Sequence, residues 1–311
     1  MEFIPDTPYL KVPPDTLQVV RDDIGMGKPG EMKEAVRILD EWVHQQPHFL
    51  EKDFPPHYLE MTIVMAKGSL ERAKRVIENI TTARTLRPEY FLPVDPRVHY
   101  EHFKEHFKLL AMPQLTSEYY RIIIVKLTGK VFNEVMAPVY KFAYTCLEYI
   151  KSHDYNSGIV LVFDMTDTDL QHFITHVNFF QLRVCLLTFL EAYGMRLKRC
   201  HLLTRSKMVH SFISLFRPIL SKKIFDRVMA NDSGEDLLQY YCKESLPKDY
   251  GGTSKSIQEL QEIVAYDLCS DEELVLIGKL SAIKMDSTKC TPSQFAEYDD
   301  MNGTFRALNI D

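Results

Sequence analysis

Residues 158–166, GIVLVFDMT, are the stretch that decides the fold. The run from Gly158 to Phe163 is continuously apolar, which is typical of a strand buried on both faces. Two more runs of strand length are YYRIIIVKL (119–127) and CHLLTR (200–205). Long helical patterns separate the three over residues 131–153, 167–195 and 207–230. Strands that alternate with helices predict an α/β fold, with a mainly parallel sheet covered by helices.

The rest of the chain divides around this region. Residues 1–30 are rich in Pro, Gly and Asp and predict an irregular arm. Three helical patterns follow, and they predict an all-helical module over residues 31–92. We expect the sheet region to span residues 93–255. Residues 256–311 are expected to form a C-terminal helix or two and a tail.

Composition excludes several functional classes. The hydrophobic share of 45% is that of an ordinary soluble globular protein, and a net charge of −6 argues against a nucleic-acid-binding protein. The six cysteines form no C-x-x-C pair, which favours reduced thiols in the cytoplasm. The first residues are acidic and broken by prolines, unlike a signal peptide. Apolar runs hold about five residues where a membrane span needs about twenty. These features predict a soluble cytoplasmic protein.

Three short motifs resemble catalytic or ligand-binding signatures but lack essential parts. GMGKPG (25–30) matches the dinucleotide fingerprint, yet no buried strand precedes it, so a flexible loop is favoured. HFITH (172–176) spaces two histidines as in a zinc helix, but Phe173 stands where a metalloprotease carries Glu. In DMTDTD (164–169), Asp164 ends a strand and Thr166 replaces the second acid of an aspartyl-phosphate motif. We therefore interpret it as a strand end followed by a helix cap.

Nothing else in the sequence suggests catalysis. No Ser, Cys or Lys lies in a recognisable nucleophile motif. We accordingly expect no catalytic residues, no metal and no cofactor.

Two apolar helical patterns are more suggestive. HVNFFQLRVCLLTFLEAYG (176–194) and MVHSFISLFRPIL (208–220) are apolar almost all round, so each should be buried on more than one side. A basic cluster that includes Lys223 and Arg227, at i and i+4, accompanies the second. The segment could be a core helix with a solvated end. Alternatively, it could close an apolar cavity and meet a membrane.

Taken together, several segments resemble the CRAL-TRIO (Sec14-like) lipid-transfer family, in its α-tocopherol-transfer and retinaldehyde-binding branch. LDEWVHQQPHF and SLERAKRVIENITTARTLRPEYF are similar to its helical module, and GIVLVFDMTD to its acid-terminated strand. YGMRLKRCHLLTRSKMVHSFISLFRPILSKKIFDRV resembles its strand and gate helix, and LPKDYGG its closing motif. The resemblance covers residues 31–260, and the ending GTFRALNID is like that of many arthropod members.

The resemblance implies a non-enzymatic, monomeric carrier that encloses one small hydrophobic lipid, of tocopherol, retinoid or carotenoid type, and exchanges it at phosphoinositide-containing membranes. The expected cavity wall, with helix positions chosen by periodicity, consists of Ile123, Val125, Tyr144, Leu161, Phe163, Phe179, Val184, Leu187 and Leu202, with Val209, Phe212, Ile213, Phe216 and Leu220 from the gate helix. The expected phosphoinositide-binding residues are Arg196, Lys198, Arg217, Lys223 and Arg227.

The chain also departs from the family pattern. Met61, Val64 and Ala66 stand where the helical module usually carries arginines, leaving only Lys67 nearby. The resemblance therefore gives no support for phosphoinositide contacts from that module. Two other functions remain open on the same fold: a phosphatidylinositol-transfer or lipid-presenting regulator, and a ligand-free protein-interaction module. A cytosolic oxidoreductase is a distant fourth.

Overall fold

Five strands form one sheet in the order β1-β2-β3-β4-β5. The computed structural model describes residues 7–91, 96–218 and 220–289. The strands are β1 (Phe107–Ala111), β2 (Tyr120–Gly129), β3 (Gly158–Thr168), β4 (Leu197–Leu203) and β5 (Val228–Asn231). β1 pairs with β2 in antiparallel fashion, and the other three pairings are parallel. The predicted α/β fold with a mainly parallel sheet is confirmed.

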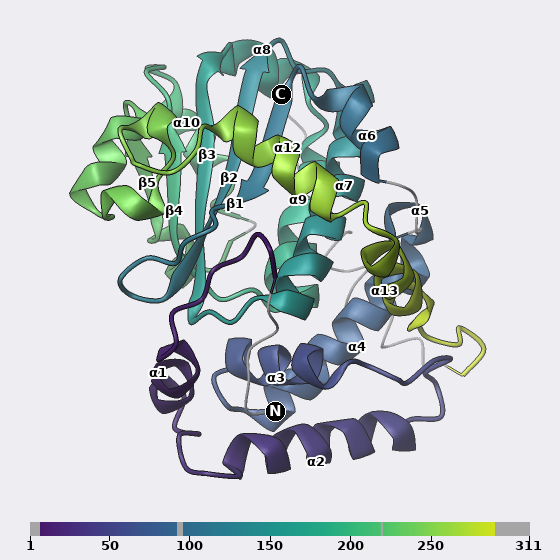
Figure 1. Cartoon of the computed structure of the whole chain (residues 1–311). Coiled ribbons are helices and arrows are strands. Elements are labelled where there is room, and N and C mark those ends of the chain that lie inside the picture. The colour runs from purple at the N-terminus through teal and green to yellow at the C-terminus, as the bar shows by residue number, and fades with distance from the viewer. Residues whose placement is uncertain (1–6, 92–95, 219, 290–311) are drawn as a thin grey trace.

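Helices cover the sheet and build the N-terminal module (Figure 1). Before the sheet lie α1 (Thr16–Asp23), α2 (Glu31–Gln45), α3 (Pro56–Met65), α4 (Leu70–Leu86), α5 (Pro88–Phe91) and α6 (Pro96–Phe103). Between strands lie α7 (Asn133–His153), α8 (Leu170–His176), α9 (Phe179–Leu187), the π-helical turn η1 (Thr188–Ala192), α10 (Val209–Ser214) and α11 (Lys222–Phe225). After β5 come the 3-10 turns η2 (Gly234–Gln239), η3 (Lys243–Ser245) and η4 (Lys248–Tyr250), then α12 (Ile257–Asp267) and α13 (Asp271–Ala282).

The structure corrects two predicted elements. The arm is not wholly irregular, because α1 forms within it and buries Thr16 and Val20 against the module. The helix expected over residues 207–230 is not continuous. α10 ends at Ser214, and β5 occupies the end of the range. Pro218 accounts for the break, since a proline has no N–H to donate to the carbonyl of Ser214.

The buried hydrophobic residues form two cores in the described part of the chain. One joins the inner face of the sheet to α7 and the helices after β3. The other joins α2, α3 and α4 and also takes in Leu280, Ile283 and Met285 from the end of α13 and the residues after it. Backbone hydrogen bonds seal this junction, from Leu50 N to Lys284 O (2.9 Å) and from Asp286 N to His48 O (2.7 Å). The C-terminal segment thus completes the N-terminal module.

Among the described residues, no single helix is long and apolar enough to cross a membrane. One pair of helical segments, Leu170–His176 and Phe179–Ala192, meets that criterion only when the two are taken together, and they are bent by 93° relative to each other.

Candidate functional site

An apolar cavity lies between the sheet and α7, α9, α10 and the residues that follow α10. The volume of this cavity is about 180 Å³. Its walls are apolar, aromatic or thiol-bearing side chains. The inner faces of β1 to β4 supply two complete rows that follow the strand register: Ala111–Ile123–Leu161–Cys200 and Leu109–Val125–Phe163–Leu202.

Most of the residues expected on the cavity wall do line it. They are Ile123, Val125, Tyr144, Leu161, Phe163, Leu202, Phe212, Ile213, Phe216 and Leu220. Phe179, Val184, Leu187 and Val209 are not among the lining residues. On α9 the cavity face instead carries Leu182, Cys185 and Leu186, so the predicted face was rotated by about one position.

Several lining residues were missed by the sequence analysis. β1, which was not predicted, contributes Phe107, Leu109 and Ala111. The other missed wall is α7, where Met136, Val139, Tyr140, Ala143, Leu147 and Ile150 line the cavity beside Tyr144. Their spacing of three or four residues is a helical stripe, which was a visible signal.

Four phenylalanines pack at the side of the cavity closed by α10. The ring of Phe212 lies 5.9 Å from that of Phe173 and 5.2 Å from that of Phe216, measured between centroids. Phe179 lies 6.2 Å from Phe216. Phe216 is half-buried and Phe212 is buried. These rings join α8 and α9 to α10 and to Phe216, which follows α10.

The thiols in the cavity wall are held in the neutral form. Burial raises the pKa of Cys185 to about 12, although a hydrogen bond with Tyr144 opposes this, and burial likewise raises the pKa of Cys200 to about 12. The wall therefore offers a ligand dispersion contacts and little charge.

The acid at the end of β3 is part of a structural tie. Asp164 is buried and accepts hydrogen bonds from Lys126 Nζ (2.9 Å), Thr166 Oγ1 (2.6 Å) and the Tyr250 hydroxyl (2.7 Å). Burial works to raise the pKa of Asp164, but these hydrogen bonds lower it overall. The interpretation of Asp164 as a structural strand end fits these contacts.

Tyr250 belongs to the LPKDYGG motif, whose glycines serve its packing. Gly251 adopts a left-handed conformation with φ +76°, and a Cβ on Gly252 would lie 2.0 Å from the carbonyl oxygen of Leu246. The two glycines therefore let the turn close back on the sheet domain, where Tyr250 reaches Asp164.

A basic cluster forms where the helical module meets β4 and α11. We define it as Lys67, Arg196, Lys198, Lys223 and Arg227. The positive charge of Lys223 is the largest cause that lowers the pKa of Lys67, followed by burial, Arg196 and Arg227. Burial, together with Arg196, Lys67 and Arg227, lowers the pKa of Lys198 to about 8, against the opposing charge of Asp23. The cations of this cluster are therefore near enough to lower the pKa of Lys67 or Lys198, and Arg72 of α4 also lowers that of Lys67.

The expected phosphoinositide-binding residues are only partly brought together. Arg196, Lys198, Lys223 and Arg227 join the cluster, although Arg196 also pairs with Asp23 at 2.9 Å. Lys223 and Arg227 do not share a helix face, because α11 ends at Phe225.

Arg217, the fifth expected residue, instead stacks over the ring of Phe225, with 4.9 Å between its guanidinium carbon and the centroid.

The rejected motifs also have defined places. His172 and His176 stack with 3.9 Å between ring centroids, and no group of three or more His, Cys, Asp or Glu side chains that could hold a metal occurs in the described part of the chain. Residues 25–30 form the loop between α1 and α2, with a helix rather than a strand before it. The tail 303–311 lies outside the described residues.

Comparison with known proteins adds to this geometry. Residues 108–252 match the CRAL/TRIO domain. This CRAL/TRIO region spans β1 to the LPKDYGG motif and contains most of the cavity wall. The chain is also similar to the crystal structure of Sfh5, with 12% sequence identity and a TM-score of 0.48, over 81% of this chain and 93% of that chain.

Proposed function

We propose that this chain is a non-enzymatic intracellular carrier that binds one small hydrophobic molecule, of tocopherol, retinoid or carotenoid type, as a monomer. The apolar cavity inside the CRAL/TRIO region is the observation that carries the proposal. Burying apolar surface contributes about 25 cal/mol per Å², so a lipid-sized ligand gains enough binding free energy without a polar anchor.

The ligand enters where the phenylalanine contacts are made. α10 has only six residues, and the chain after it turns before α11 begins. The segment from α10 to Leu220 therefore has few backbone hydrogen bonds to break when it moves. Separation of Phe212 and Phe216 from Phe173 and Phe179 would open that side of the cavity. The segment from α10 to Leu220 therefore acts as the gate.

Exchange takes place at a membrane, to which the basic cluster binds. Lys67 and Lys223 are exposed, and Lys223 follows the gate segment directly. Each Lys or Arg near an anionic leaflet contributes about 1 kcal/mol of binding free energy. The cluster accordingly orients the gate toward phosphoinositide-containing membranes.

A phosphatidylinositol-transfer or lipid-presenting regulator is the second candidate function. The basic cluster favours it, since its cations suit an anionic headgroup. In that case the bound molecule is a phospholipid.

Native mass spectrometry of protein purified from its source, followed by lipid extraction, tests the function. The carrier predicts a stoichiometric apolar molecule without phosphate, and the regulator predicts a phospholipid. Protein that carries no ligand, and binds none when hydrophobic molecules are added, would contradict both candidates. It would instead favour the ligand-free protein-interaction module.

The membrane step has its own test, which is liposome co-sedimentation with and without phosphatidylinositol bisphosphate. Lys223→Ala/Arg227→Ala should lose about 2 kcal/mol of binding free energy, roughly a factor of thirty, because it removes two cations of the cluster. Binding by wild type should weaken as salt is raised. Arg217→Ala/Lys222→Ala is the matched control, since it removes two charges of the same segment from outside the cluster. Equal loss in the two double variants would refute a specific role for the cluster.

A further inference from the structure

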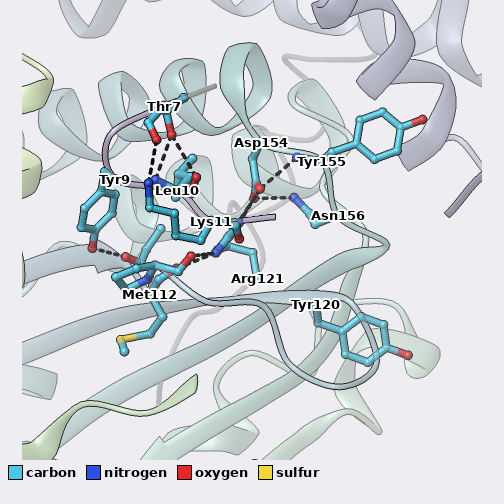
Figure 2. Close-up of polar contacts among 12 residues, drawn as sticks. Thr7, Tyr9, Leu10, Lys11, Met112, Tyr120, Arg121, Asp154, Tyr155 and Asn156 are labelled. Carbon is cyan, nitrogen blue, oxygen red and sulfur yellow. Dashed lines mark hydrogen bonds and ion pairs between the residues drawn. The ribbon is translucent and has the colours of Figure 1, made fainter. Parts of the chain in front are cut away.

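The residues that precede α1 form a strap against the sheet domain. In this strap, residues 7–11, Tyr9 and Leu10 are 5% and 4% exposed and belong to the same core as the cavity wall. The Tyr9 hydroxyl donates to the carbonyl oxygen of Ala111, and Lys11 N donates to Pro113 O at 2.9 Å (Figure 2). The strap is therefore packed into the fold at the end of β1.

The strap lies at one end of the cavity. Toward the start of the parallel strands, Leu197 also lines the cavity, one row beyond the last complete row of Ala111, Ile123, Leu161 and Cys200. Arg121 precedes Ile123 by two residues on β2, so its side chain leaves the same face of the sheet, one step beyond that row. Arg121 therefore lies at this end of the cavity, in the same row of the sheet as Leu197.

Arg121 joins the strap to the rest of this floor. Its guanidinium is fully buried and pairs with both carboxylate oxygens of Asp154, at 2.5 and 2.8 Å. It also donates to the carbonyl oxygens of Met112 (2.8 Å), Pro113 (2.6 Å) and Lys11 (3.3 Å), as Figure 2 shows. All five N–H groups of the arginine are thus used. None is left for the polar end of a ligand, so an apolar end belongs there.

The cavity wall on the side of the strap includes small residues. Ala111 and Cys146, two of the lining residues at this end, have small side chains. Tyr9 belongs to the same buried core as Cys146 and Tyr149, and its hydroxyl donates to the carbonyl oxygen of Ala111. Burial raises the pKa of Tyr9, and the charge of Arg121 opposes this shift. Tyr9 therefore packs in the same core as these two lining residues, next to the end of β1.

We propose that the strap, held by the Arg121–Asp154 pair, closes the floor of the cavity and so sets the longest apolar chain that the cavity accepts. This inference rests on the proposed carrier function, and it makes Tyr9 and Leu10 specificity-determining residues that do not line the cavity. A ligand lies with the end of its apolar chain against Ala111, and its length is limited by the strap rather than by the gate.

The test measures binding of straight-chain primary alcohols of increasing length to the full chain, by displacement of a fluorescent apolar probe. For wild type, affinity should rise about fourfold per methylene up to a limiting length and then fall. In Tyr9→Ala/Leu10→Ala the limit should move to longer alcohols, because the floor recedes. Val19→Ala, an exposed apolar position on α1, is the control and should keep the wild-type limit.

A second readout does not depend on any ligand. Cys146 should react faster with a water-soluble maleimide in the strap variant than in wild type, relative to the exposed Cys242 in the same molecule. If the double variant does not fold, Leu10→Ala replaces it, with the limit shifted by at least one methylene.

A folded strap variant with an unchanged limit and unchanged Cys146 labelling would overturn the inference. Wild type that binds no alcohol and no probe would instead refute the carrier function.

Discussion

Lys151 is an ionisable side chain buried where the helical module meets the sheet domain. It lies on α7, is 2% exposed, donates to the Tyr193 carbonyl oxygen at 3.2 Å and sits 4.5 Å above the ring of Tyr58. Nearby, Arg84 pairs with Glu148 at 2.6 Å. Burial lowers the pKa of Lys151 from 10.5 to about 7, with Glu148 opposing and Arg84 adding to the shift. The helical module and the sheet domain therefore meet around a lysine that is half neutral near pH 7.

This lysine makes stability depend on pH in a defined window. Between about pH 10.5 and pH 7 the unfolded chain holds the proton and the folded chain does not, so stability falls as the pH is lowered through this range. Lys151→Met removes the effect. Its unfolding free energy relative to wild type should rise by about 1 kcal/mol per pH unit from pH 10 down to pH 7 and level off below that.

Urea unfolding of both proteins at several pH values measures this difference. Lys33→Met, at an exposed position on α2, is the control and should show no such slope. A Lys151→Met difference that does not vary with pH would show that the lysine stays charged in the folded protein.

At the scale of elements, the gate segment differs most from its predicted form. Phe216 follows α10 in a turn, is half-buried and contacts the rings of Phe179 and Phe212. Phe216→Asp should therefore reduce binding of a fluorescent apolar probe more than tenfold and leave most of the fold intact, because the carboxylate can turn toward water. Probe titration together with a thermal melt checks both parts. A collapsed melting transition would contradict the gate, since only a residue of the closed core would unfold the protein in this way.

The same elements show what the sequence could predict. Side chains of a β-strand alternate between its two faces, so one inward-facing residue of β2 or β3 fixes which others face inward. For this reason Ile123, Val125, Leu161 and Phe163, which were expected on the cavity wall, do line the cavity. α9 is apolar all round, so its periodicity could not select the face that carries Leu182 and Cys185. β1 and β5 are short edge strands of four or five residues, too short for a periodic signal. Lys67 comes near the other cations of the basic cluster only in the folded chain, and no local sequence pattern encodes this.

At the scale of the whole molecule, the residues at the end of α13 and just after it complete the core of the N-terminal helical module. Ile283, just after α13, is 2% exposed in the core of the helical module, and its carbonyl oxygen accepts from Arg84 Nη1 at 3.2 Å. Ile283→Ala should cost about 2–4 kcal/mol of unfolding free energy. It should also lower the hydrogen-exchange protection of α2, α3 and α4, although they lie about 200 to 250 residues away in sequence.

Val275→Ala provides the comparison, because this α13 side chain is 58% exposed and its loss should change stability by less than about 0.5 kcal/mol. Unchanged exchange in α2, α3 and α4 of Ile283→Ala would mean that the module does not need the C-terminal residues.

The junction between residues 48–50 and 284–286 has a consequence for the order in which the chain is made. The helices of the N-terminal module leave the ribosome first, but Leu280, Ile283 and Met285, which complete their core, follow almost two hundred residues later. At ribosomal speeds that delay is about 10–40 s. Throughout this interval the apolar faces of α2, α3 and α4 lack their last partners, so the nascent module is the part of the chain that a chaperone would bind.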